Sequence, residues 1–430
     1  MFAFGGLYEW TLVPAGLLAA LALFLNRPTV FGRSLALDLA LTSALAVVVL
    51  QAIPLPPFVW SILSPHAIDL KRALTVGIPD FAGWQALSIS PPATWRSAAW
   101  IAVAIAVFWS ARHLFEHGRL GSLLRPIGIA GLAVSSIAIV QRAATPLLMY
   151  GLWPAADASA KPFGPFVNRN HMAAWLIMAI PLTAGYAITR LRSRIASLPD
   201  QRLAMAQAID ATAVWQIGAI LTMISTVFVS VSRSGVVGLL IGTAAGFTFA
   251  SLKGVKVRFQ WVAAVAVLLL ASATYLANFD ALADHFARAL DRGTERTEIW
   301  RQTMPIVRDF AIAGTGQGTF SRAMLVYQQG DRSVLFNQAH DQYLQIVAEG
   351  GVLLTVPACC AVLIAAAGAM RRLKEDSTVI FWARAGAASA LAAIAVQSVW
   401  ETGLSMPANS VLFAICAALA LHHPAADRQR

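Results

Sequence analysis

The chain has few charged residues for its length. Of its 430 residues, 12% are Asp, Glu, Lys or Arg and 58% are hydrophobic, whereas a soluble domain has about 25% charged residues. This shortage excludes an ordinary soluble domain and indicates a protein that lies in a membrane. The net charge of +11 does not indicate nucleic-acid binding, because basic residues of membrane proteins collect in loops on the cytoplasmic side.

Motifs that would bring particular kinds of chemistry are also missing. The three cysteines, Cys359, Cys360 and Cys416, lie in apolar segments without a C-x-x-C pair, so we expect no disulfide framework and no structural zinc. The sequence has neither an H-E-x-x-H zinc motif nor a G-x-S-x-G serine elbow, and no metal or cofactor is predicted. The first segment lacks the basic region of a cleavable signal peptide, so we expect it to remain as a helix.

Apolar segments recur from one end of the chain to the other, and segments of about 20 residues cross a bilayer as helices. Eleven are expected, at Leu7–Leu25, Leu35–Ile53, Ala98–Leu114, Leu123–Gln141, His171–Ile188, Ala213–Val231, Gly235–Ala250, Trp261–Ala277, Val352–Met370, Ala383–Trp400 and Asn409–Leu421. The predicted fold is an all-α integral membrane protein with about 11–12 transmembrane helices.

Lysine and arginine are divided unevenly between the predicted loops. One set of loops carries 17 of them and the opposite short loops carry 7, so the richer side is predicted to be cytoplasmic. The chain then divides into transmembrane helices at 1–277, a long, partly helical outer loop at 278–351, and further helices with a short cytoplasmic tail at 352–430. The outer loop contains seven arginines, but long loops cross the membrane regardless of charge.

Arg233 stands in a tight turn, Ser232-Arg233-Ser234-Gly235, between two apolar segments. An arginine there is costly unless it meets an anion or an aqueous cavity. The start of the following helix also exposes backbone N–H groups, which favour an anion. Two interpretations remain: a clamp for phosphate, or an arginine that extends to the membrane surface.

The outer loop offers further cations. Arg292, Arg296 and Trp300 are four residues apart, so a helix would place them on one face. A guanidinium binds phosphate through paired hydrogen bonds. The alternative is an ordinary solvated helix face. The glycine-rich stretch Gly314–Thr319 lacks the lysine of a nucleotide-binding loop, and we interpret it as a tight turn.

His340 is the strongest candidate for a catalytic residue. It lies in the segment Ala339–Gln345 at the predicted start of a helix, where helical spacing would place Asp341, Gln345 and Glu349 on a neighbouring stripe. Imidazole accepts a proton near neutral pH, and a nearby carboxylate could orient it. The alternative is a histidine that caps the helix or is satisfied in the core.

Several motifs, taken in order, resemble the O-antigen ligase and polymerase family. They are Phe166–His171, Ser232–Gly235, Arg296–Trp300, Gly314–Phe320, Ala339–Gln345 with Glu349–Gly351, and Pro407–Asn409. The resemblance extends from about Pro54 to Leu421. The motif that contains His340 is the most specific of them. Ligases of this kind often have twelve helices, whereas this sequence predicts eleven.

The resemblance implies a bacterial inner-membrane glycosyltransferase, GT-C-like and independent of metal. Such proteins take a glycan from undecaprenyl diphosphate at the periplasmic face and transfer it to a hydroxyl of another glycan or of lipid A-core. The implied roles are the base for His340 and the diphosphate ligands for Arg233 and Arg296. Further candidates for substrate binding are Arg292, Arg169, Asn170, His171, Asp341, Tyr343 and Glu349.

Other functions remain open at this point. Within the family, the chain could polymerise repeat units, ligate a finished glycan, or transfer it to protein. A secondary transporter of a small anion or solute is the alternative from another class. Transporters of that kind usually contain two repeated halves with broken helices, and the sequence shows no such repeat.

Overall fold

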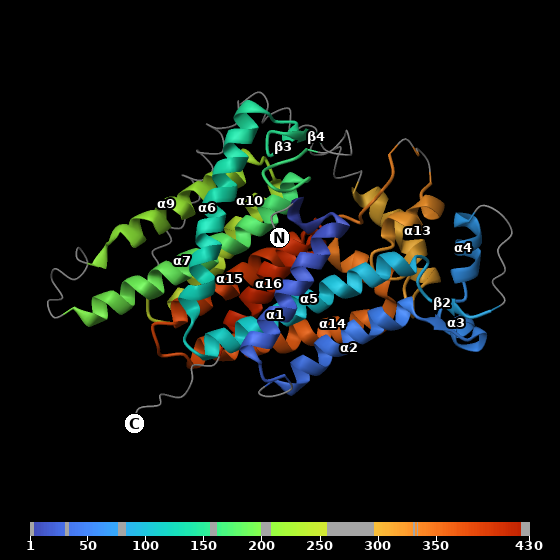
Figure 1. Cartoon of the computed structure of the whole chain (residues 1–430), viewed down its shortest axis with the longest axis horizontal. Coiled ribbons are helices and arrows are strands. Elements are labelled where there is room, and N and C mark those ends of the chain that lie inside the picture. Colours follow the sequence, from blue (N-terminus) through green and yellow to red (C-terminus); the bar gives the residue numbers. More distant parts are fainter. Residues whose placement is uncertain are drawn as a thin grey trace.

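The computed structural model describes residues 4–30, 34–75, 83–154, 161–198, 208–255, 296–329, 332 and 334–422. This part of the chain is mainly helical, with two pairs of short antiparallel strands, β1–β2 and β3–β4 (Figure 1). The elements in chain order are η1 (Phe4–Gly6), η2 (Glu9–Thr11), α1 (Leu12–Asn26), α2 (Leu35–Ala52), β1 (Pro54–Leu55), α3 (Pro57–Leu63), α4 (Ala67–Leu74), β2 (Gln85–Ala86), α5 (Pro91–Glu116), α6 (Leu120–Ala144), β3 (Leu148–Met149), β4 (Trp153–Pro154), α7 (Arg169–Ser197), α9 (Ala211–Val229), α10 (Arg233–Ser251), α13 (Phe320–Tyr327), α14 (Gln342–Glu375), α15 (Phe381–Gln397), η3 (Gly403–Ser405) and α16 (Pro407–Ala420). Residues 296–309 are also helical.

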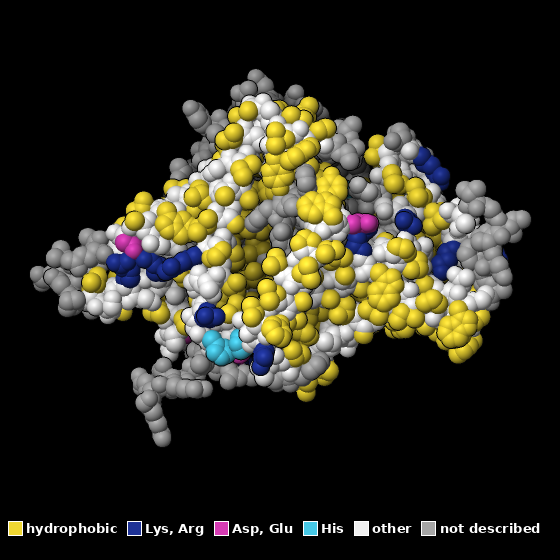
Figure 2. Space-filling view, viewed as in Figure 1, with side chains coloured by type: hydrophobic (Ala, Val, Ile, Leu, Met, Phe, Trp, Pro, Cys, Tyr) yellow, Lys and Arg dark blue, Asp and Glu magenta, His cyan; other side chains and the backbone are white. Residues whose placement is uncertain are grey.

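The described helices agree with the predicted membrane spans. Among the described residues, eight helical segments are long and apolar enough to cross a bilayer. Helix α15, with 17 residues, and α16, with 14, cover two further predicted spans. The predicted span Trp261–Ala277 lies outside the described residues. The prediction of an all-α integral membrane protein is confirmed, and Figure 2 shows a face covered largely by hydrophobic side chains.

Several predicted boundaries differ in the structure: α5 begins at Pro91 rather than Ala98, and α7 ends at Ser197 rather than Ile188. The largest difference is at α14. A span was expected to begin at Val352, but α14 begins already at Gln342 and continues past a break at Gly351, where φ is 57° and ψ is −165°. The hydropathy pattern marked only the apolar part of this helix. Its first turns carry Gln342, Gln345 and Glu349, which are buried among other protein groups. A hydropathy pattern identifies residues that contact lipid, so it does not include these polar turns in the span.

Helix α7 is the centre of the bundle. In the most apolar stretch of this helix 78% of the residues are buried. The helix packs most extensively against α15. The two backbones come close at a pair of glycines: a Cβ added to Gly386 would lie 2.2 Å from the Pro181 carbonyl oxygen, and one added to Gly185 would lie 2.4 Å from the Trp382 carbonyl oxygen. Small residues at such a crossing allow close packing of membrane helices.

A second, smaller core forms a cap at one end of the helices. Leu70 of α4, Ile299 and Ile306 of the helix at 296–309, and Phe320 of α13 are buried together there. Figure 1 shows α3, α4 and α13 gathered beside the same ends of α2, α5 and α14. The cap is therefore built from two segments far apart in the sequence, the α2–α5 connection and the region before α14.

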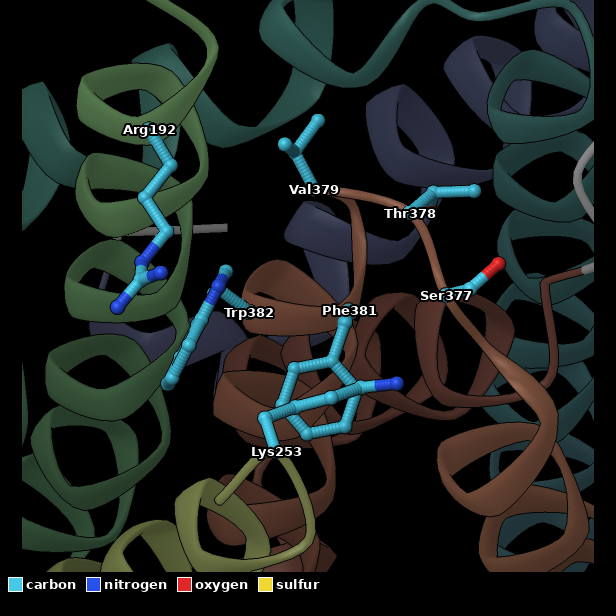
Figure 3. Close-up of a pocket in the computed structure, with 7 residues that line it drawn as sticks. All are labelled: Arg192, Lys253, Ser377, Thr378, Val379, Phe381 and Trp382. Carbon is cyan, nitrogen blue, oxygen red and sulfur yellow. The ribbon is translucent and has the colours of Figure 1, made fainter. Parts of the chain in front are cut away.

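Basic side chains meet aromatic rings at the far end of α7. The Cζ atom of Arg192 lies 4.6 Å from the centre of the Trp382 ring, and Nζ of Lys253 lies 4.9 Å from the centre of the Phe381 ring. With Ser377 they line a pocket of about 190 Å³ (Figure 3). The predicted positive loops after α7 and α10 thus meet at one end of the bundle, away from the cap.

Candidate active site

Three connections meet at the cap end of the bundle, and each contributes polar side chains to one cluster. They are the start of α7 with Asn170 and His171, the turn before α14 with His340, and the α15–α16 connection with Glu401. The helix at 296–309 adds Arg296. We call the group Asn170, His171, Arg296, His340 and Glu401 the Glu401 cluster.

Glu401 is the central member of this cluster. Its side chain is 1% exposed. Its Oε1 accepts a hydrogen bond from Arg296 Nη2 at 2.6 Å and another from Asn170 Nδ2 at 2.7 Å. Its Oε2 lies 3.6 Å from His340 Nδ1, and neither of these two atoms has a hydrogen-bond partner among the described residues. A buried carboxylate is costly unless it is paired and hydrogen-bonded, and Arg296 and Asn170 provide these contacts to Glu401.

The backbone on both sides fixes His340 in place. Its φ is 50°, in the left-handed region that non-glycine residues rarely occupy. The preceding residue, Ala339, is held by Trp300, whose Nε1 donates to its carbonyl oxygen at 3.0 Å, and by Gln345, whose Oε1 accepts from its amide at 3.1 Å. Strained backbone held by its surroundings is found mostly at functional sites.

The helix expected to contain His340 begins after it. Asp341 is the N-cap of α14, and its Oδ1 accepts hydrogen bonds from the amides of Tyr343 at 2.9 Å and Leu344 at 3.0 Å. Helical spacing counted from His340 therefore does not predict its neighbours, because His340 precedes the N-cap residue of α14. The carboxylate that faces its imidazole belongs to Glu401, not to the neighbouring Asp341.

His171 lies deeper in the same cluster. It is buried in the first turn of α7, and its Nε2 has no hydrogen-bond partner among the described residues. It lies near Glu401 and His340. Asn409 of α16 donates through Nδ2 to the His171 carbonyl oxygen at 3.1 Å and to that of Gly403 at 2.8 Å, which ties α7 to the α15–α16 connection.

The turn with Arg233 lies beside the first turn of α7. Val231 has φ 53°, and Ser232 caps α10 by accepting a hydrogen bond from the Gly235 amide at 3.2 Å. A Cβ on Gly235 would lie 2.6 Å from the Cβ of Ala173, so glycine allows α10 to approach α7. Arg233 itself is exposed at the start of α10, at the same end of the bundle as the Glu401 cluster.

The remaining predicted site residues are spread over the same end. Arg169 is the first residue of α7 and is partly exposed. Tyr343 is exposed, and its hydroxyl donates to the Ala395 carbonyl oxygen at 2.8 Å. Arg292 lies outside the described residues. Among the described residues, no group of three or more His, Cys, Asp or Glu side chains is arranged to hold a metal ion.

Glu349 lies away from the Glu401 cluster and joins the glycine-rich turn to α14. Its Oε1 accepts from the Phe320 amide at 2.8 Å and its Oε2 accepts from Gln317 Nε2 at 2.8 Å. Gln51 of α2 donates through Nε2 to the carbonyl oxygens of Ala313 at 2.6 Å and Glu349 at 2.9 Å. These contacts attach the cap to the kink of α14.

The close approach at that kink predicts a sensitive position. A Cβ on Gly351 would lie 2.4 Å from the Ile312 carbonyl oxygen, and its backbone conformation is open essentially only to glycine, at a cost on the order of 1–3 kcal/mol for other residues. We expect Gly351→Ala to lower the thermal unfolding temperature of the purified protein clearly. Gly218→Ala is the matched control, because a Cβ there meets nothing within 4 Å; an equal loss in both variants would contradict this account.

Fold and site together define a polytopic all-α membrane protein with a buried acid–histidine cluster at one end. Residues 218–359 match the family model described as O-antigen ligase. The match covers part of the chain and confirms the predicted resemblance to the O-antigen ligase and polymerase family. The family suggests a glycosyltransferase-type enzyme that acts on lipid-linked glycans. A comparison with curated proteins found no match.

Glu401 is not among the site residues predicted from the sequence. The signal was present: a carboxylate between two apolar segments, six residues before the Pro407–Asn409 motif. An acidic residue within or next to a membrane span is costly and by default marks a functional site. Local patterns around His340 contain only the acids that are near it in the sequence. Glu401 is brought close to His340 by the folding of the α15–α16 connection.

Proposed function

We propose that the chain is an inner-membrane transferase that moves a glycan from undecaprenyl diphosphate to an acceptor hydroxyl at the periplasmic face. The observation that carries the proposal is the 3.6 Å approach of His340 Nδ1 to the buried Glu401 Oε2, in a chain that matches the O-antigen ligase model. An imidazole held beside a carboxylate is suited to remove a proton from a sugar hydroxyl.

His340 acts as the general base in this proposal. Because its Nδ1 faces Glu401, Nε2 is the nitrogen that accepts the hydroxyl proton. The hydroxyl oxygen then forms a bond to the anomeric carbon of the donor sugar. The bond from that carbon to the diphosphate oxygen breaks, and its electron pair leaves with undecaprenyl diphosphate. The anomeric configuration is inverted, since the attack and the departure occur on opposite sides of the carbon.

Cations at the same end of the bundle bind the leaving diphosphate. Negative charge develops on it in the transition state, and positive groups fixed beforehand stabilise that charge. Arg233 is exposed at the start of α10, and Arg169 is partly exposed at the start of α7. Arg296 differs from them, because its Nη2 is hydrogen-bonded to Glu401. In the proposal Arg233 is therefore the principal diphosphate ligand. Arg296 contacts both the diphosphate and Glu401, the carboxylate beside the base.

The direct experiment uses the purified protein in lipid nanodiscs with an undecaprenyl-diphosphate oligosaccharide. Three reactions run in parallel: donor alone, donor with lipid A-core, and donor with a peptide acceptor. Longer lipid-linked glycans from donor alone indicate a polymerase, and glycan on lipid A-core indicates a ligase. Absence of product in all three, from protein that elutes as a single species, would contradict the proposed transfer.

Arg233→Lys tests the diphosphate ligand. Lysine keeps the charge but cannot form the paired hydrogen bonds of a guanidinium. Charge-assisted hydrogen bonds contribute about 1.5–3 kcal/mol each, so loss of one is expected to raise the Kd for the lipid-linked donor by about 10–10²-fold. The measurement is a donor titration of the variant. Arg301→Lys is the control, because Arg301 is exposed and paired with Glu298; unchanged donor affinity in Arg233→Lys would contradict the assignment.

A further inference from the structure

We infer that Glu401 is the positioning residue of the base: it orients the His340 imidazole through Nδ1 and stabilises the imidazolium formed when the acceptor loses its proton. This inference rests on the proposed transfer reaction. Glu401 lies outside residues 218–359, which match the family model, so its place in the site follows from the folded structure alone.

The two carboxylate oxygens have different surroundings. Oε1 accepts both hydrogen bonds, from Arg296 and Asn170. Oε2 is buried without a hydrogen-bond partner among the described residues. His340 Nδ1, which is also buried without a partner, lies 3.6 Å from it. A carboxylate that served only to neutralise Arg296 could turn both oxygens to the guanidinium. Here one oxygen is left for the imidazole.

The separation of 3.6 Å is longer than a hydrogen bond. Catalytic hydrogen bonds are often long before substrate binds and shorten in the reacting complex. When Nε2 accepts a proton, Nδ1 keeps its own, and the imidazolium becomes a full cation beside an anion in a buried setting. Attraction between them is strong there because little water screens it. Glu401 thus stabilises the state that the transfer passes through.

Hydrogen bonds between the two loops fix the positions of His340 and Glu401 relative to each other. The Gln342 amide donates to the Ser398 carbonyl oxygen at 2.8 Å, and Thr402 Oγ1 donates to Gln338 Oε1 at 2.7 Å. These contacts join the two loops on both sides of His340 and Glu401. A positioning residue needs such support, because a site that is loose by about 1 Å loses much of its effect.

The test is a cycle of variants measured for kcat and for the donor KM. Glu401→Gln keeps the size of the side chain and removes its charge. We expect kcat to fall by about 10–10²-fold, less than the loss of the base itself, with the donor KM changed by less than about threefold. In a His340→Ala background the same change is expected to cost less than about threefold, because the residue that it positions is gone.

Glu401→Asp and Glu298→Gln complete the design. Aspartate restores the charge and is expected to recover part of kcat. Glu298→Gln removes a partly exposed carboxylate from the helix that carries Arg296 and is expected to leave kcat unchanged. Equal losses from Glu401→Gln with and without His340, or a wild-type kcat, overturn the inference. If Glu401→Gln does not purify, the same cycle with Glu401→Asp decides. Absence of turnover in the unmodified protein would instead reject the proposed function.

Discussion

Replacement of His340 by alanine is expected to lower the rate of glycan transfer by about 10²–10⁴-fold, while the protein still inserts and purifies. A sugar hydroxyl is a weak nucleophile until a base removes its proton. Among the described histidines, His340 is the one paired with the Glu401 carboxylate, at 3.6 Å. The side chain is partly exposed, so its removal leaves no buried cavity. The measurement is turnover of the lipid-linked donor in nanodiscs at saturating acceptor.

His66→Ala is the matched control. His66 is exposed in the cap at the start of α4, and it forms no hydrogen bond or ion pair with a described residue of the Glu401 cluster. Its replacement is expected to leave the rate unchanged. If His340→Ala turned over the donor at the rate of the unmodified protein, His340 would not be the base, whatever the activity of the control.

Arg384→Met is expected to destabilise the protein by about 3–5 kcal/mol, the usual cost of breaking a buried ion pair on one side. Arg384 and Asp376 are each 1% exposed, and Arg384 Nη1 contacts Asp376 Oδ2. Its Nη2 also donates to the His422 carbonyl oxygen at 2.8 Å. Methionine would leave the Asp376 carboxylate buried without its cation. The measurement is the midpoint of unfolding in a graded denaturant.

A second variant separates charge from packing. Arg384→Met combined with Asp376→Asn removes both charges, and we expect it to recover most of the lost stability, because the unpaired carboxylate is gone. Arg301→Met is the control for an exposed pair, since Arg301 and Glu298 are 66% and 40% exposed; surface pairs contribute about 0–1 kcal/mol. A double variant no more stable than Arg384→Met would show that packing, and not charge, sets the cost.

Most of the helical framework could be predicted from the sequence, and the reason is physical. A segment that crosses a bilayer must satisfy its backbone internally and present apolar side chains to lipid, so long apolar runs are direct evidence of helices. Ten of the eleven predicted spans fall on described helices. The exact start of α14 was not predictable in this way, because Gln342, Gln345 and Glu349 in its first turns are buried against protein groups rather than exposed to lipid.

The site was less predictable than the fold. His340 and Arg296 could be selected, because each stands out as a polar residue in a recognisable pattern. Their relation could not be derived, since it depends on Glu401, which is 61 residues beyond His340 in the chain. The carboxylate expected to orient the histidine could not be identified by helical spacing, because the left-handed backbone at His340 precedes the start of α14. Contacts between distant segments are set by packing and leave little trace in local patterns.

The central claim is that the Glu401 cluster faces the side of the membrane where finished lipid-linked glycans are presented. Its most direct test is labelling of single cysteines in sealed spheroplasts with a maleimide that cannot cross membranes. Cys359, Cys360 and Cys416 are first replaced by serine or alanine. Two exposed positions are then compared: Ser405, close to Glu401, and Lys374, near the far end of α14.

We expect Ser405→Cys to react in intact spheroplasts and Lys374→Cys to react only after the membrane is opened. Reaction of Lys374→Cys in intact spheroplasts, with Ser405→Cys protected until lysis, would place the Glu401 cluster in the cytoplasm and contradict the proposed transfer.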